Sequence, residues 1–308
     1  MTDVVIINWN SGSLLYEAVQ SICTSQNINY TGRIIIIDNA STDNSADAIN
    51  ISEKILLIRN AENRGFAKAC NQGFKLCSSP FVLLLNPDAR LLNNTLPECI
   101  LFMQKNENID VLGCQLLDEL GKVTYSCSRF PTPLRFFYDA VGLSKIAPAI
   151  FTPATIMTDW NHQESREVNQ VMGAFMFMRH SVFKKTGYFD ERFFVYFEEL
   201  DFSKRIQDAG GSTYYNAAIQ AVHKGEGTTS QVKAFRLFLN LNSRLEYAKK
   251  HFSHTGFYVV WVSTFLIEPF SRLVFTLVKG QIKDAGEIIS AYVLLMQRKK
   301  YFKKKATS

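Results

Sequence analysis

The chain has 308 residues, of which 47% are hydrophobic and 20% are charged, and its formal net charge is +6. This composition excludes a disordered chain, and the length allows one large domain or a domain with an appendage. Six basic residues among the last eleven account for the surplus charge, so the body is near neutral and a nucleic-acid-binding body is not expected.

The first hundred residues alternate predicted strands with predicted helices. The expected strands are Val4–Ile7, Arg33–Ile37, Lys54–Ile58 and Phe81–Leu85, and the expected helices are Ser13–Thr24, Ser45–Ile51 and Gly65–Leu76. Continuous apolar strands between amphipathic helices indicate an α/β fold with a parallel sheet covered on both faces.

The middle of the chain is less regular. We expect a helix at Thr95–Lys105, then a hairpin of Asp110–Leu117 with Lys122–Tyr125, then irregular loops over Pro131–Asn169. A strand-like run at Val171–Met178 and a helix at Glu198–Asp208 follow. The last elements expected here are a strand-like run at Thr213–Tyr215 and a polar loop at His223–Thr229.

Three helices are expected at 231–251, 256–278 and 281–302. The middle one is very apolar, but Glu268, Pro269 and Arg272 interrupt it, so we expect an interfacial or hairpin element rather than a membrane-spanning helix. Together with the basic cluster from Arg298 to Lys305, it predicts peripheral docking on a membrane. The alternative is packing against the catalytic domain or a second subunit.

The six cysteines form no CxxC pair and have no nearby histidine, so a zinc site is not expected. Because no signal peptide is recognisable at the start of the sequence, we expect reduced thiols in a cytosolic protein.

Polar residues follow three of the predicted strands. Asn8 and Asn10 follow the first, Asp38 to Asp43 the second, and Asn86 to Asp88 the fourth. Ligands bind at the carboxyl ends of strands in open α/β sheets, so these clusters outline one site. Taken singly, each could be only a turn or a helix cap.

Three carboxylates, those of Glu198, Glu199 and Asp201, directly follow the aromatic block Phe193–Phe197. Burying a carboxylate without a partner is costly, so such a cluster indicates a metal, a basic substrate group or a general base. The alternative is an acidic helix N-terminus, which the helix dipole favours.

Several motifs, in this order, resemble family-2 glycosyltransferases, and within that family the bacterial rhamnosyltransferase branch. They are Val5–Ser11, Asp38–Asp43, Asn63–Ala67, Leu84–Asp88, Gly173–Met176, Gly187–Asp190, Tyr196–Asp201 and His223, and the resemblance covers residues 4–230.

The resemblance implies a GT-A fold over residues 1–230, with a nucleotide-sugar-binding half (1–95) and an acceptor-binding half (96–230), followed by a helical extension (231–308). It implies an inverting enzyme in which Asp38 contacts a pyrimidine base. The residues implied to bind the nucleotide sugar are Asn8, Asn10, Asp38, Asn39, Arg64, Gly65, Asn86 and Asp88.

The resemblance further implies that Mg²⁺ or Mn²⁺ is bound at Asp88, with His223 completing the site unless it is only a hydrogen-bonded loop histidine. Glu199 matches the position of the general base, with Glu198 as the second candidate. Asp201 would orient the loop or bind acceptor hydroxyl groups. Relatives often carry Asp where Glu199 stands, so the distance at which the longer Glu199 side chain meets the acceptor hydroxyl is left open.

The function implied is transfer of L-rhamnose from dTDP-rhamnose to a polyprenyl-diphosphate-linked saccharide in O-antigen or other surface-polysaccharide synthesis. The enzyme would act on the inner face of the cell membrane and could form a homo-oligomer. UDP-linked hexoses are alternative donors. A sugar-nucleotide nucleotidyltransferase is disfavoured because residues 8–12 are not a glycine-rich phosphate loop, and a non-catalytic scaffold because the carboxylates are present.

Overall fold

The computed structural model describes residues 1–225, 233–280, 282–298 and 301–302. The chain forms two compact units. The N-terminal unit comprises Met1–Phe130, Trp160–Phe194 and Glu198–Thr228, and the C-terminal unit comprises Pro131–Asp159, Val195–Phe197 and Thr229–Ser308. The C-terminal unit thus takes two segments from the middle of the chain.

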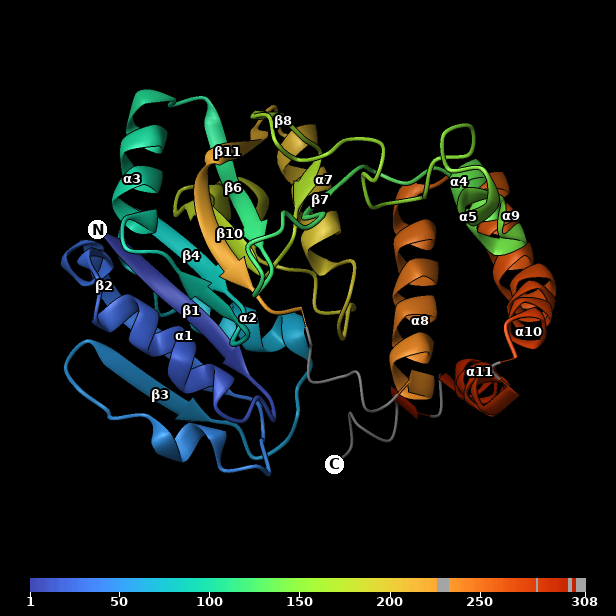
Figure 1. Ribbon diagram of the computed structural model, residues 1–308, viewed down its shortest axis with the longest axis horizontal. Helices are drawn as coiled ribbons and strands as arrows, with labels where there is room; N and C mark the ends of the chain where they lie inside the picture. Colours follow the sequence, from blue (N-terminus) through green and yellow to red (C-terminus); the bar gives the residue numbers. More distant parts are fainter. Residues whose placement is uncertain (226–232, 281, 299–300, 303–308) are drawn as a thin grey trace. The chain divides into compact units, whose positions relative to one another are not determined.

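The N-terminal unit is built on a nine-stranded sheet of order β3-β2-β1-β4-β10-β6-β11-β5, with β8 paired to β11 (Figure 1). The strands are β1 (Thr2–Asn8), β2 (Thr31–Asp38), β3 (Ile55–Arg59), β4 (Phe81–Leu85), β5 (Ala89–Leu91), β6 (Ile109–Leu117), β8 (Arg166–Glu167), β10 (Phe175–Arg179) and β11 (Ser212–His223). Strands β1 to β4 pair in parallel, so the predicted parallel sheet is confirmed.

Helices of this unit supply the second layer of the core. They are α1 (Leu14–Cys23), α2 (Phe66–Phe74), α3 (Thr95–Lys105), α6 (Val182–Thr186) and α7 (Glu198–Asp208). The helix expected at 45–51 is only a 3₁₀ turn, Ser45–Ala48, because the backbone at Ile49 is already extended. In β1 every side chain is buried, which explains its unbroken apolar sequence.

Two elements in the middle of the chain differ in extent from the expectation. The hairpin partner at 122–125 is reduced to one bridge between Leu117 and Val123. The short run at 213–215 is part of β11, which has 12 residues, pairs with both β6 and β5, and shifts register between Asn216 and Gln220. A separate two-stranded sheet joins β7 (Cys127–Ser128) and β9 (Gln170–Val171).

The C-terminal unit is helical. Its elements are α4 (Pro133–Val141), α5 (Leu143–Ile146), α8 (Lys233–His251), α9 (His254–Val262), a π turn (Ser263–Ile267), α10 (Glu268–Val278) and α11 (Ile282–Met296). Helix α4 lies where irregular loops were expected. The Thr132 hydroxyl accepts a hydrogen bond from the Arg135 N–H at 3.3 Å, and Pro133 suits the first helical position.

The helix expected at 256–278 is present, because α9, the π turn and α10 form one uninterrupted helical run. Of the two expected forms, an interfacial element or a hairpin, the hairpin is wrong. Of the described residues, this run, His254–Val278, is the one helix long and apolar enough to cross a membrane, judged by length and composition alone. The predicted basic cluster lies outside the described residues except for Arg298, as does the predicted polar loop beyond residue 225.

At the start of the sheet, a buried carboxylate joins three chain segments. Asp3 accepts hydrogen bonds from the backbone N–H groups of Arg33 (2.9 Å), Ser78 (2.7 Å) and Ser79 (2.9 Å), and from the Ser79 hydroxyl (2.9 Å). Burial raises the pKa of Asp3, but these hydrogen bonds outweigh it and the pKa lies below its usual value near 3.8.

We expect Asp3→Asn to lower the free energy of unfolding by about 1–3 kcal/mol, because one N–H acceptor is lost in a buried site. Since the folded pKa is depressed, the carboxylate stabilises the fold above the unfolded pKa, and this contribution is lost as the pH falls through the folded pKa. Urea unfolding between pH 3 and pH 7 measures it. The control Asp47→Asn, at an exposed ion pair with Arg59, should cost only about 0–1 kcal/mol. Equal effects would contradict the assignment.

Candidate active site

The side chain of Asn8 ties together the carboxyl ends of β1 and β2. Its amide nitrogen lies 2.7 Å from Asp38 Oδ1, 3.0 Å from Ser41 Oγ and 2.8 Å from Ser45 Oγ, and the Ser11 hydroxyl donates to its amide oxygen. Asn8 is fully buried. The amide therefore uses its hydrogen-bonding groups on the protein, and it fixes one carboxylate oxygen of Asp38.

Asn10 joins the loops that follow β1 and β2. Its backbone adopts a left-handed conformation (φ 51°). Its backbone N–H donates to Ser41 Oγ (3.0 Å), and its amide oxygen accepts from the Thr42 N–H (2.7 Å). The Asp43 carboxylate closes the arrangement by accepting from the Gly12 N–H (2.7 Å). The polar residues that follow β1 and those that follow β2 are therefore joined in one hydrogen-bonded network.

Asn39, the residue after β2, organises the loop between β3 and α2. Its amide nitrogen donates to Asn63 Oδ1 (3.0 Å), and its amide oxygen accepts from Asn60 Nδ2 (3.1 Å) and the Arg64 N–H (3.0 Å). The Arg64 side chain itself is exposed. Asn39 therefore holds the loop that carries Arg64 against the carboxyl end of β2.

Gly65 begins α2 at a position that has room only for glycine. Its φ is +84°, and a Cβ there would lie 2.7 Å from the Phe194 ring and from the Phe194 carbonyl oxygen. That carbonyl accepts a hydrogen bond of 2.6 Å from the Phe66 N–H. The start of α2 and the aromatic block before the acid pair are therefore in direct contact.

The structure brings Asp88 and His223 together, 135 residues apart in sequence. Strand β5 pairs with β11 so that His223 lies opposite Ala89, and His223 Nε2 is 3.3 Å from Asp88 Oδ1. Both side chains are largely buried. Asn86 forms the turn between β4 and β5, with its backbone carbonyl accepting from the Ala89 N–H (3.1 Å).

A carboxylate beside an imidazole suits a divalent cation that takes its remaining ligands from substrate phosphates and water. No group of three or more His, Cys, Asp or Glu side chains that could hold a metal occurs among the described residues. Mg²⁺ at phosphate sites is commonly held by only one or two carboxylates together with substrate oxygens and water.

The acids Glu198, Glu199 and Asp201 form the first turn of α7. Glu198 and Asp201 are buried, so the turn is more than a solvated acidic helix end. Burial raises the pKa of Glu199, partly offset by the backbone N–H groups of Glu199 and Gly173. A Cβ on Gly173 would lie 2.9 Å from Glu199 Oε1, so the glycine leaves room for the carboxylate.

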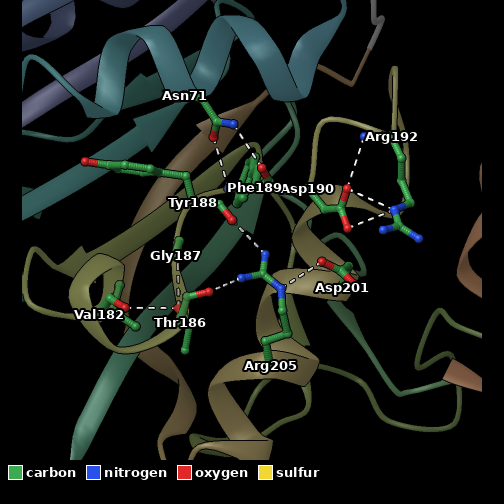
Figure 2. Close-up of polar contacts among 10 residues, drawn as sticks. All are labelled: Asn71, Val182, Thr186, Gly187, Tyr188, Phe189, Asp190, Arg192, Asp201 and Arg205. Atoms are coloured by element: carbon green, nitrogen blue, oxygen red, sulfur yellow. Dashed lines mark hydrogen bonds and ion pairs between the residues drawn. The ribbon is translucent and has the colours of Figure 1, made fainter. Parts of the chain in front are cut away.

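Asp201 is ion-paired with Arg205, whose Nε donates to Asp201 Oδ2 at 2.9 Å (Figure 2). The same guanidinium donates to the carbonyl oxygens of Thr186 and, at 2.8 Å, Tyr188. Through Arg205, Asp201 is thus linked to the backbone of the loop at Thr186 and Tyr188.

Asn71 of α2, which the sequence did not single out, holds the same loop from its other side. Its amide donates to the Phe189 carbonyl (2.9 Å) and accepts from the Phe189 N–H (3.0 Å), as Figure 2 shows. Gly173 and Arg205 were likewise not assigned these roles. The i, i+4 spacing of Asp201 and Arg205 is a sequence signal that could have identified their pair.

All six cysteines are free, and five of them are buried. Burial raises the pKa of Cys77 to about 12 and that of Cys127 to about 12. Such thiols stay protonated at neutral pH and do not act as nucleophiles.

A mixed sheet with polar loops at the carboxyl ends of its parallel strands, an Asp–His pair and a buried acid turn is an arrangement that fits a transferase with a GT-A fold. The family profile described as Glycosyl transferase family 2 matches residues 3–187, and the chain belongs to this family. It is a glycosyltransferase.

Relatives include enzymes named for rhamnose transfer. The chain is 26% identical over 190 residues to "Rhamnosyltransferase WbbL" of Escherichia coli, covering 60% of this chain and 68% of that protein. It is 25% identical over 259 residues to "N-acetylglucosaminyl-diphospho-decaprenol L-rhamnosyltransferase" of Mycobacterium tuberculosis, covering 77% of this chain and 81% of that one.

Among solved structures, the fold is similar to a mannosyltransferase from Pyrobaculum calidifontis in complex with GDP-Man and Mn²⁺. The TM-score is 0.57 at 13% identity, covering 97% of this chain and 87% of the other. A structure of residues 1–349 of TarS from S. aureus gives a TM-score of 0.51 at 13% identity, covering 97% and 91%. These likenesses confirm the predicted GT-A fold.

If Glu199 is the general base, its raised pKa places the acid limb of the kcat profile above the ordinary glutamate pKa of about 4.3. A general base works as a carboxylate, so kcat should fall as the pH drops through this raised pKa. Gly173→Ala should lower kcat and move the limb, since the added methyl group displaces the carboxylate. The control Gly286→Ala, with open space around its Cβ, should change neither. An unmoved limb in Gly173→Ala would contradict this coupling.

Proposed function

We propose that this glycosyltransferase transfers L-rhamnose from dTDP-rhamnose, with inversion, to a saccharide carried on a polyprenyl diphosphate. The observation that carries the proposal is the combined site in the N-terminal unit: the Asn8–Asp38 strand-end network, the Asp88–His223 pair and the acid turn of α7. The two relatives named as rhamnosyltransferases support the donor sugar. The Mycobacterium enzyme's name supports a lipid-linked acceptor.

Asp38 is proposed to select the base. Its carboxylate is held by Asn8 through one oxygen, and a carboxylate accepts the single N3–H of thymine or uracil. The same chemistry accepts UDP, so a UDP-hexose remains the second candidate donor. The relative from Haloferax volcanii named as a hexosyltransferase, 20% identical over 260 residues, favours keeping this candidate.

Asp88 and His223 would hold Mg²⁺ or Mn²⁺, with the metal supplying a positive charge that balances the diphosphate. The Pyrobaculum neighbour, solved with Mn²⁺, supports a divalent cation. Glu199 is proposed to take the proton of the attacking acceptor hydroxyl. The new bond forms at the anomeric carbon, the bond to the diphosphate oxygen breaks, and its electron pair leaves with the dTDP.

A polyprenyl-linked acceptor presents its sugar at a membrane surface. We therefore place the enzyme at the inner face of the cell membrane, in the synthesis of O-antigen or another surface polysaccharide. The long apolar helical run of the C-terminal unit supports this location.

We expect the purified enzyme to release dTDP from dTDP-rhamnose when N-acetylglucosaminyl-diphospho-decaprenol and Mn²⁺ are present, and to form a rhamnosylated lipid. Glu199→Gln should lower kcat by about 10²–10⁴-fold with little change in dTDP affinity. Mass spectrometry of the lipid and dTDP calorimetry measure these quantities, with the exposed Glu53→Gln as control. Product formation from UDP-hexoses alone would reassign the donor, and normal turnover in Glu199→Gln would remove Glu199 from the role.

Asp88→Asn should weaken Mn²⁺-dependent binding of dTDP more than His223→Ala does, because a hard cation loses a charged oxygen ligand. Both variants should bind metal-free dTDP like the wild type. Calorimetry with and without EDTA separates metal-dependent from metal-free binding of dTDP. The matched control is Asp208→Asn, because Asp208 is an exposed acid. Wild-type activity that survives EDTA would overturn the metal assignment for both residues.

A further inference from the structure

The helical run of the C-terminal unit, His254–Val278, has its polarity reversed relative to a helix on a water-facing protein surface. Define as the outward stripe the residues Tyr258, Val262, Leu266, Phe270, Val274 and Val278, which are 62, 38, 56, 68, 60 and 81% exposed. Define as the inward stripe the residues Gly256, Val260, Thr264, Glu268, Arg272 and Thr276, which are buried or partly buried. The exposed stripe is entirely apolar except for one tyrosine hydroxyl.

The charges in this run turn into the unit and are paired there. Glu268 Oε2 lies 2.5 Å from Arg244 Nη1 of α8, and Glu268 Oε1 lies 2.6 Å from Arg272 Nη2. Burial raises the pKa of Glu268, but the two guanidinium groups outweigh it and hold the pKa low. The residues that interrupt the apolar sequence therefore leave the outward stripe uncharged.

The π turn keeps the outward stripe on one side. Residues four apart drift around an α-helix of 3.6 residues per turn. A π turn closes its hydrogen bonds one residue later than an α turn and so takes up one additional residue. Placed at Ser263–Ile267, between α9 and α10, it offsets the drift and brings Tyr258 and Phe270 back toward a common face.

The exposed apolar surface is large. An aromatic side chain carries about 150–250 Å², so Tyr258 and Phe270 together expose about 200–300 Å². The aliphatic members of the outward stripe add to this. Helix α11, which packs on α10, exposes Ile289, Val293 and Met296 as well. Exposed apolar patches beyond a few hundred Å² mark interaction sites.

We propose that the outward stripe is buried in the headgroup region of a lipid bilayer, with the helical run lying along the membrane surface. The proposal rests on the proposed function, whose acceptor is membrane-bound. Because the inward stripe is covered by α4, α8 and α11, half of the helix already has a protein partner, so it lies in the interface and does not cross the bilayer.

The charges beside the patch favour anionic lipid over a second copy of the chain. Lys145 and Lys279 lie 4.8 and 4.5 Å from the Phe275 ring, and Arg298 lies 5.7 Å from the Phe265 ring. Anionic headgroups attract such cations. A two-fold dimer would place the same patch, with the same positive charges, against itself.

Vesicle flotation tests the proposal, with vesicles of phosphatidylcholine containing anionic phosphatidylglycerol. The wild-type chain should float, and Leu266→Glu combined with Phe270→Glu should lower the bound fraction at least about tenfold, since charges in the interface are costly. Leu120→Glu, a 93% exposed leucine of the N-terminal unit, is the matched control and should float normally. Equal flotation of wild type and the double variant overturns the proposal.

Trp261, which is 36% exposed on the same helix, gives a second readout that needs no destabilising charge. Brominated phospholipids should quench its fluorescence, and Trp261→Phe should remove the quenching. Absence of quenching would overturn the proposal. A dimer that forms without lipid in ultracentrifugation, and that the double variant abolishes, would overturn it in favour of self-association. If the wild type floats but transfers no rhamnose, membrane docking stands and the proposed function fails. If it transfers rhamnose but does not float, the proposed function stands and membrane docking fails.

Discussion

The candidate site depends on the requirement that the buried amide of Asn8 be fully hydrogen-bonded. A buried donor or acceptor left without a partner costs about 1–3 kcal/mol. Because the partners of Asn8 come from the loops after β1 and β2 and from the 3₁₀ turn, this single requirement fixes all three against one another. Asn39 does the same for the loop before α2. The strand ends are thus preorganised before any ligand arrives.

The sequence predicted the parts of the molecule that local patterns control. The unbroken apolar runs of β1, β2 and β4 predicted the parallel sheet, and the ordered motifs predicted the family. What it missed depends on partners distant in the chain. The extent of β11 follows from its pairing with β6 and β5, and that pairing also brings His223 to Asp88. The charge of Glu268 can be buried within the helical run because it pairs with Arg244, 24 residues earlier. Periodicity carries no information about such partners.

The approach to the acid turn is strained. Tyr196 and Phe197 both have left-handed backbones, with φ of 68° and 71°, a conformation that costs non-glycine residues about 1–3 kcal/mol each. Two hydrogen bonds anchor the residues directly before them: the Phe194 carbonyl accepts from the Phe66 N–H, and the Val195 carbonyl accepts from the Ser243 hydroxyl at 2.8 Å. These contacts restrain the chain directly before the strained pair.

The interleaving of the two units has a consequence for how the protein is made. A ribosome delivers the chain N-terminus first, and domains generally fold as units in that order. Here, Pro131–Asp159 and Val195–Phe197 belong with helices that are translated after them. The strained segment before Glu198 therefore gains its contact with Ser243 only after α8 has been made. A nascent chain can thus complete the strands of the N-terminal unit before this segment is anchored, so the segment before Glu198 is among the late-forming parts of the fold.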